Sequence, residues 1–167
     1  VSGLRSPRVL LAFAPEGLKA ACCKNVGGHV NRGCELELTG SAVLREAYPV
    51  SDALHVLRAL GFRIALDDFG LGDSSWLRVK HLPVDTLKVD RAFTSALTVD
   101  GRNAAIIEAM VTLGERAGLE VVAEGIETAQ QLGRLRELGI RLGQGFHCGR
   151  PVELSDLAEW MAAPRPR

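Results

Sequence analysis

An apolar run that ends abruptly in two adjacent aspartates constrains this chain more than any other feature. The run Ile64–Leu66 is typical of a buried strand, and Asp67 and Asp68 follow it directly, before a turn that begins at Gly70. Two carboxylates this close repel each other and raise each other's pKa unless a cation lies nearby. A pair taken alone is more typical of a solvated turn or a helix N-cap, so the remainder of the chain must decide between these and a divalent metal.

Strands and helices alternate along the part of the chain that has clear periodicity. A period of two predicts a strand over Cys34–Thr39, and an apolar stripe at Leu54, Leu57 and Leu60 predicts a helix capped by Ser51 or Asp52. Such alternation indicates βα units on a parallel sheet or barrel. The other predicted elements are strands at 9–13, 86–90, 119–123 and 140–142, a loop after Asp90, and helices at 103–118, at 153–162 and from a Thr128–Gln131 capping box to Gly139.

Polar side chains follow the ends of five predicted strands. On the strand Thr86–Asp90, Lys88 and Asp90 point to the same face, because side chains at i and i+2 do so. Parallel strands deliver such groups to one rim, where β/α barrels hold their active sites. Oxygen-rich groups suit Mg²⁺ or Mn²⁺ better than zinc and favour phosphate ester hydrolysis. The predicted rim comprises Glu37, Asp67, Asp68, Lys88, Asp90, Glu124 and Gln144.

Composition narrows the class of protein. Twenty basic and twenty acidic side chains balance and do not run in blocks, which argues against nucleic acid polymers or anionic membranes as partners. No apolar stretch approaches the roughly 20 residues of a membrane span, so we expect a cytosolic protein. The four cysteines lack CxxC spacing and are expected to be reduced; a zinc site is a weaker alternative. That alternative would use Cys22, Cys23, His29 and Cys34.

Four motifs occur in an order that identifies a family. They are ALDDFGLGDSS, LPVDTLKVDRAF, VVAEGIET and GQGFHCGRP, between Glu35 and Glu153. The chain resembles the EAL-domain family of cyclic di-GMP phosphodiesterases. The resemblance implies a TIM-like (β/α) barrel that cuts cyclic di-GMP to the linear dinucleotide with Mg²⁺ or Mn²⁺ and is inhibited by Ca²⁺. With 167 residues, the chain is short for a barrel that needs about 200 to 250, so we expect an incomplete α/β barrel of five to six βα units.

The resemblance also implies roles for individual residues. Lys88, from the LKxD motif, would contact the metal-bound water, and Glu124 would serve the metal site or act as the base. Glu127 and Gln144 would support substrate and site, although Glu127 also suits the first turn of a helix. The implied metal ligands are Glu37, Asp67, Asp68 and Glu124.

Departures from the family pattern weaken the expected site. The Glu-Ala-Leu signature, with its metal-binding glutamate, is missing at its usual distance from Glu37; the sequence 16–18 (EGL) is a degenerate copy at best. Ala12 stands where a metal-binding asparagine is expected. Fewer oxygen ligands mean weaker metal binding and a misplaced nucleophile, so we expect steeply reduced activity. The loop after the aspartates also departs at Leu71 and Asp73, and Gly40 replaces the glutamate that orders this loop in the family.

Three functional hypotheses follow. The first is a truncated or degenerate phosphodiesterase, and the second is an inactive regulatory module that binds cyclic di-GMP or protein partners. The third is an unrelated metal-dependent barrel enzyme. An unclosed barrel exposes strand edges, so a second copy or another chain could complete it. We expect a divergent segment at 1–34, a partial barrel at 35–162 and a tail at 163–167.

Overall fold

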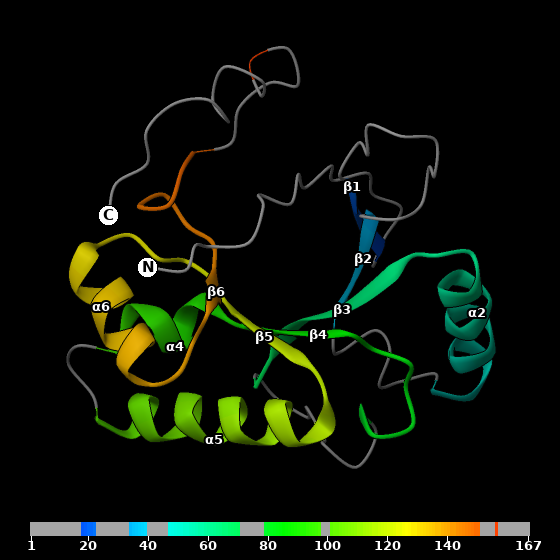
Figure 1. Cartoon of the computed structure of the whole chain (residues 1–167), viewed down its shortest axis with the longest axis horizontal. Helices are drawn as coiled ribbons and strands as arrows, with labels where there is room; N and C mark the ends of the chain where they lie inside the picture. The colour runs from blue at the N-terminus through cyan, green and yellow to red at the C-terminus, as the bar shows by residue number, and fades with distance from the viewer. Residues whose placement is uncertain are drawn as a thin grey trace.

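The computed structural model describes residues 18–22, 34–39, 47–70, 79–97, 101–150 and 156. Within these residues, a six-stranded sheet carries helices along one side (Figure 1). The strands lie in the sheet in the same order as in the chain. They are β1 (Leu18–Cys22), β2 (Cys34–Thr39), β3 (Arg63–Phe69), β4 (Thr86–Val89), β5 (Glu120–Ala123) and β6 (Leu142–Gly143).

The pairing of the strands confirms an incomplete α/β fold. From β2 to β6 all neighbours are parallel, as βα units require. In the described part of the chain β1 and β6 each have a single neighbour, so the sheet is open. β1 was not predicted; it pairs antiparallel with β2, from Leu18 opposite Leu38 to Cys22 opposite Cys34. The predicted domain boundary at residue 35 stays a prediction.

The helices follow the predicted order with shifted ends. They are α2 (Ala47–Ala59), α4 (Arg91–Ser95), α5 (Gly101–Ala117) and α6 (Ala129–Glu137). The predicted cap of α2 at Ser51 or Asp52 is wrong, because the helix already begins at Ala47. Pro49 lies in its first turn, where the missing N–H costs no hydrogen bond. The predicted loop after Asp90 is also wrong, since α4 starts there.

The start of α6 confirms its predicted capping box. The Thr128 hydroxyl accepts from the Gln131 N–H, and the Gln131 side chain accepts in return from the Thr128 N–H. These bonds satisfy N–H groups that the helix itself cannot pair. The box fixes where the chain turns from the end of β5 into α6.

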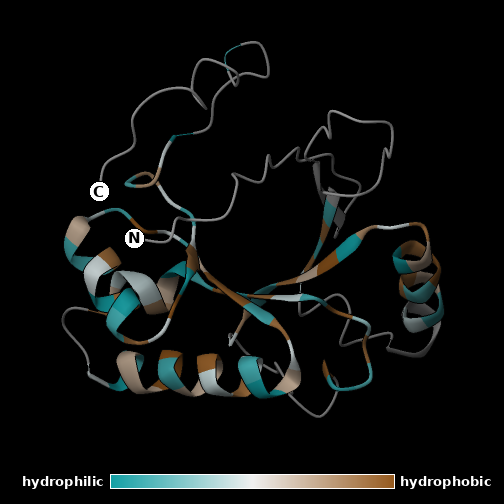
Figure 2. Ribbon diagram, in the orientation of Figure 1, coloured by the Kyte–Doolittle hydropathy of each residue, from teal (hydrophilic) through white to brown (hydrophobic). Residues whose placement is uncertain are grey.

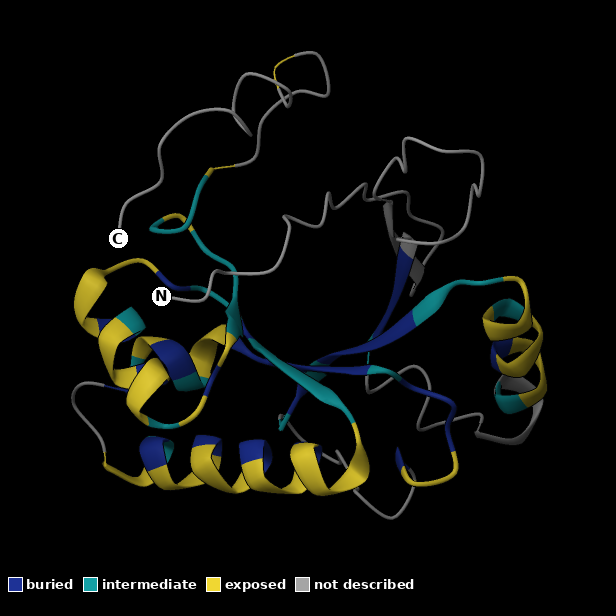
Figure 3. Cartoon of the chain, in the orientation of Figure 1, coloured by how far each residue is buried: buried dark blue, intermediate teal, exposed yellow. Residues whose placement is uncertain are grey.

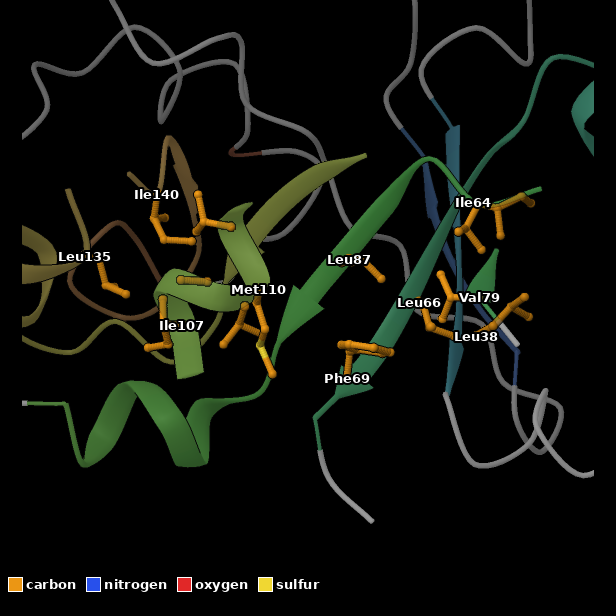
Figure 4. Packing of buried hydrophobic residues seen from close by; sticks show 14 of the residues in the cluster. Leu38, Ile64, Leu66, Phe69, Val79, Leu87, Ile107, Met110, Leu135 and Ile140 are labelled. Carbon is orange, nitrogen blue, oxygen red and sulfur yellow. The ribbon is translucent and has the colours of Figure 1, made fainter. Parts of the chain in front are cut away.

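One hydrophobic core lies between the sheet and its helices. Side chains of β3 and β4, such as Ile64 and Leu87, pack in the same cluster as Ile107 of α5 and Leu135 of α6 (Figure 4). The buried residues of α5 line the side nearest the sheet, and its exposed residues lie on the opposite side (Figure 3). The hydropathy of the ribbon follows the same division (Figure 2). The sheet therefore has one apolar face and leaves its other face for polar side chains.

Two leucines of the predicted helices are exposed instead of buried. Leu60, at the end of α2, is 55% exposed, and Leu113 of α5 is 45% exposed. Gly114 takes the buried position next to Leu113, where an added Cβ would lie 2.4 Å from the Val121 side chain. The sheet approaches α5 too closely there for a larger side chain.

Several predictions concern residues outside the described ranges. These are the strand at 9–13 and the helix at 153–162, together with the departures at Ala12, Glu16, Gly40, Leu71 and Asp73. The side chains of the zinc alternative, Cys22, Cys23, His29 and Cys34, also lie outside them. In the described ranges, no helix has the length and apolar character that a membrane span requires.

Candidate metal centre

An irregularity in β3 brings the two aspartates together. Leu66 pairs with Leu87 and Phe69 pairs with Val89, so β3 uses one more residue than β4 over this interval. Asp67 and Asp68 lie inside this bulge. On a regular strand their side chains would point to opposite faces, whereas a bulge redirects one of them. A carboxylate oxygen of each, together with one of Glu124, lies within a mutual distance of 4.8 Å.

The backbone at Asp68 is held in an uncommon conformation. Its φ of 53° is in the left-handed region, which a residue with a side chain enters at a cost of about 1–3 kcal/mol. Gly70 follows with φ 102°, and an added Cβ there would lie 2.4 Å from Met110 Cε. Such strained positions concentrate at functional sites. The turn thus aims the aspartates at the cost of local strain.

Lys88 is the centre of a buried charge cluster. Its Nζ lies 2.8 Å from Glu37 Oε1 and 3.3 Å from Asp67 Oδ1, and it also contacts Glu124 Oε1. The Lys88 side chain is 4% exposed. These contacts join β2, β3, β4 and the residue after β5, as the predicted rim requires. We call Glu37, Asp67, Lys88 and Glu124 the Lys88 layer.

Burial and charge act against each other in this layer. Burial raises the pKa of Glu37 and of Glu124 above the ordinary value, and the Lys88 ammonium only partly offsets it. Burial by itself would lower the pKa of Lys88, but the Glu124 and Glu37 carboxylates outweigh it and raise that pKa. The lysine therefore stays charged at neutral pH, while the two glutamates hold protons more readily than exposed ones do.

Gln144 completes the contacts around Glu124. Its Nε2 donates to Glu124 Oε1 over 2.5 Å, so this oxygen accepts from both Gln144 and Lys88. Gln144 comes directly after β6, and Glu124 directly after β5. The structure thus brings together the polar ends of five parallel strands.

The group of Asp67, Asp68 and Glu124 fits a hard divalent cation. Oxygen ligands lie about 2.0–2.6 Å from Mg²⁺ or Ca²⁺, so ligands of one ion lie no more than about 5 Å apart. The carboxylate oxygens of Asp67, Asp68 and Glu124 lie within 4.8 Å of one another and so meet this limit. Carboxylate oxygens are also the donors that these cations prefer.

A second charge cluster lies two to four residues earlier on the same strands. Arg63 contacts Glu120 Oε2 at 2.6 Å through Nη2, and Glu35 Oε2 at 3.4 Å through Nε. The Thr86 hydroxyl donates to the same Glu35 oxygen over 2.8 Å. We call Glu35, Arg63, Thr86 and Glu120 the Arg63 layer. It was not predicted, although the alternation from Glu35 to Glu37 and from Thr86 to Lys88 carried the signal.

Two predicted rim residues behave differently from the others. The Asp90 carboxylate caps α4 by accepting from the Ala92 N–H over 2.7 Å, and its predicted place beside Lys88 stays a prediction. It follows the last residue of β4, where the chain has turned out of the strand. Glu127 is exposed and its N–H donates to Gln131 Oε1. Its predicted substrate role stays a prediction.

Comparison with known proteins agrees with this geometry. The sequence profile described as the EAL domain matches residues 18–151. The chain belongs to the EAL domain family. It is 40% identical over 131 residues to the cyclic di-GMP phosphodiesterase NbdA of Pseudomonas aeruginosa. The aligned region covers 78% of this chain and 17% of NbdA. This EAL chain thus spans about a sixth of the length of that curated relative.

Solved EAL structures share the fold. The phosphodiesterase MucR of Pseudomonas aeruginosa in complex with c-di-GMP superposes with a TM-score of 0.70 and 44% identity, over 74% of this chain and 50% of that one. Klebsiella pneumoniae BlrP1, in complexes with c-di-GMP and manganese or calcium, superposes with a TM-score of 0.66 and 36% identity. This match covers 69% of this chain and 29% of the BlrP1 chain. The EAL fold of this chain therefore corresponds to part of each solved chain.

Proposed function

We propose that this EAL domain hydrolyses cyclic di-GMP to the linear dinucleotide with Mg²⁺ or Mn²⁺ as cofactor. The observation that carries the proposal is the convergence of Asp67, Asp68 and Glu124 within 4.8 Å beside the buried Lys88. The names of NbdA and of the MucR and BlrP1 complexes support cyclic di-GMP as the substrate, and the manganese complex of BlrP1 supports Mn²⁺ as the cation. Inhibition by Ca²⁺ belongs to the same proposal.

The reaction adds water to one phosphorus and breaks its bond to a ribose oxygen. A bound divalent cation would polarise the phosphoryl oxygens and favour an ionised nucleophile. Asp67, Asp68, Glu124 and Glu37 would hold the cation. Lys88 supplies a fixed positive charge beside them and orients the attacking water or stabilises the developing negative charge. Burial raises the pKa of Glu124 above its ordinary value, which makes its carboxylate a stronger base, so it could accept a proton from water if it does not ligate the cation.

A second candidate is a regulatory domain that binds cyclic di-GMP without cutting it. The sequence favours it through Ala12, where a ligand amide is expected, and through the missing signature glutamate. A site with fewer ligands binds its cation weakly and still offers charged and polar groups to a nucleotide.

Chromatography of the products separates these candidates. The purified, folded chain is incubated with cyclic di-GMP and Mn²⁺, and the linear dinucleotide is quantified. We expect product that vanishes when Ca²⁺ replaces Mn²⁺ and in the Asp67→Asn variant, while Glu137→Gln, on the exposed face of α6, leaves turnover unchanged. Binding without product would favour the regulatory candidate. Neither binding nor product would contradict both.

The remaining parts of the proposal concern context. We assign the site to a partial barrel over 35–162, with 1–34 and 163–167 outside it, and a second chain as the partner that would complete the barrel. Reduced cysteines are typical of a reducing compartment, and the sequence lacks CxxC spacing, so we propose a cytoplasmic location.

A further inference from the structure

Two loops beside the candidate site are joined through their backbones. The Glu124 loop (residues 124–128) follows β5, and the Gln144 loop (residues 144–148) follows β6. The Gln144 N–H donates to the Ala123 carbonyl over 2.8 Å, and the Ile126 N–H donates to the Gln144 carbonyl over 3.1 Å. The His147 N–H donates to the Ile126 carbonyl over 2.9 Å. This ladder continues the pairing of β5 and β6 past the ends of both strands.

Two glycines allow the loops to approach this closely. An added Cβ at Gly145, whose φ is 155°, would lie 2.2 Å from both the nitrogen and the oxygen of Ile126. At Gly143 it would lie 2.4 Å from the Ile126 Cδ1. The first collision is with backbone and cannot be relieved by rotating a side chain. The second is with the end of a buried side chain, since Ile126 is 0% exposed.

The ladder flanks the side-chain contact between Gln144 and Glu124. Glu124 Oε1 accepts from Gln144 and from Lys88, so the orientation of the carboxylate depends on where the Gln144 backbone lies. A shift of the Gln144 loop would lengthen this hydrogen bond and release one restraint on Glu124. The carboxylate would then lose its fixed position relative to Asp67 and Asp68.

We propose that Gly145 is a positioning residue: by seating the Gln144 loop on the Ile126 backbone, it fixes the Glu124 carboxylate in the orientation that a divalent cation requires. This inference rests on the proposed function, because it takes Asp67, Asp68 and Glu124 as the cation site. Partners that orient metal ligands typically change metal affinity about 10- to 100-fold when lost.

The first test compares Gly145→Ala with Gly118→Ala. Gly118 ends α5 with φ 73° and has no atom within 4 Å of an added Cβ, so its substitution strains the backbone without a collision. We expect Gly145→Ala to speed hydrogen exchange at the Ile126 and His147 amides, leave the α5 amides protected, and weaken Mn²⁺ binding at least about tenfold. Gly118→Ala should change neither the exchange of the Ile126 and His147 amides nor the Mn²⁺ affinity. Equal Mn²⁺ affinity in folded Gly145→Ala and wild type would overturn the inference.

A second test uses the difference between the two collisions. Ile126→Val removes the Cδ1 atom that an added Cβ at Gly143 would meet, but it leaves the backbone that Gly145 contacts. We expect Gly143→Ala to lose Mn²⁺ affinity and amide protection at residue 126, Ile126→Val to restore both properties to Gly143→Ala, and Ile126→Val to restore neither to Gly145→Ala. Rescue of both variants, or of neither, would contradict the proposed contacts. Should Gly145→Ala fail to fold, Gly143→Ala with and without Ile126→Val still tests whether the seating of the Gln144 loop on Ile126 sets Mn²⁺ affinity, and unchanged affinity in folded Gly143→Ala would overturn that link.

Failure of the proposed function has a different signature. A wild-type chain that is folded, protects the Ile126 amide and binds no Mn²⁺ would overturn the cation site and, with it, the positioning role of Gly145. A chain that binds Mn²⁺ but makes no product would overturn only the hydrolytic function, and the affinities of the glycine variants would still test the positioning role.

Discussion

The two charge layers of the sheet share their strands and differ in what surrounds their cation. In the Arg63 layer, a guanidinium lies between two carboxylates and a threonine hydroxyl, and the Arg63 side chain is 36% exposed. In the Lys88 layer, an ammonium that is 4% exposed contacts three carboxylates, and Asp68 adds a fourth nearby. Among the described residues, the Lys88 layer therefore has the larger excess of negative charge.

This difference explains why a divalent cation suits one layer only. A guanidinium offers several donors in a plane and can bind acids on both sides of it, whereas an ammonium is a point charge. Buried carboxylates without sufficient counter-charge cost free energy, which a bound cation would offset. The Arg63 layer ties β2, β3, β4 and β5 together, and the Lys88 layer has the composition of a binding site.

The largest contrast is expected from removing each cation. Lys88→Met leaves buried carboxylates without their counter-charge and should lower the free energy of unfolding by about 3–5 kcal/mol. Arg63→Met should cost about 1 kcal/mol or less, because solvent screens a side chain that is over a third exposed. Urea unfolding of the metal-free variants measures both. Equal losses would show that the layers do not differ as described.

A carboxylate from each layer gives the next contrast. Asp67→Asn removes one charged oxygen ligand and should weaken Mn²⁺ binding at least about tenfold. Glu35→Gln keeps its shape, lies in the Arg63 layer and should leave Mn²⁺ affinity unchanged. Isothermal titration calorimetry supplies the affinities. A similar loss in both variants would place the cation elsewhere.

The pH dependence of stability should follow the raised carboxyl pKa values. The pKa values of Glu37 and Glu124 in the folded chain are raised above their ordinary value of 4.5. At pH values just above 4.5, the folded chain therefore binds more protons than the unfolded chain. The stability of the metal-free chain should therefore fall as the pH rises from about 4.5, while Lys88 stays charged.

Mn²⁺ should reverse this trend. Cations bind the ionised carboxylates, so the increase in melting temperature on adding Mn²⁺ should grow as the pH rises. Thermal unfolding at several pH values, with and without Mn²⁺, tests this, and Glu37→Gln should flatten the metal-free curve. An increase in melting temperature that is the same at every pH would contradict the assigned shifts.

The smallest effect is expected at Asp90. Its carboxylate caps α4, so Asp90→Ala should cost about 1 kcal/mol of stability and leave Mn²⁺ affinity unchanged. Asp90→Asn should retain most of the stability, because an amide oxygen also caps a helix. Urea unfolding and calorimetry together provide the check. A large loss of Mn²⁺ affinity would contradict this and show that Asp90 also serves the rim, as the sequence predicts.

The sequence predicted the rim because strand periodicity is a local pattern, and because the alternation of strands and helices along the chain indicates parallel strands. Glu37 and Lys88 lie within the last residues of their strands, Glu124 and Gln144 come directly after theirs, and parallel strands bring such positions together. The cap at Asp90 was not predicted, because the same residue type ends a strand or caps a helix, and spacing alone does not distinguish the two.

The missed features depend on contacts between distant segments. The bulge at Asp67 and Asp68 appears only when β3 is paired with β4. The closeness of Gly145 to Ile126 likewise requires the sheet to be assembled. β1 has no clear alternation and is defined by its pairing with β2. Patterns within one segment do not report such relations.

The most direct test of the account is to locate a bound cation. Crystals of the chain grown with Mn²⁺ give an anomalous difference map that marks the ion. We predict a peak among the carboxylates of Asp67, Asp68 and Glu124, and none beside Arg63. A well-ordered Lys88 layer without a peak, or a peak at the Arg63 layer, would contradict the assignment of the Lys88 layer as the metal centre.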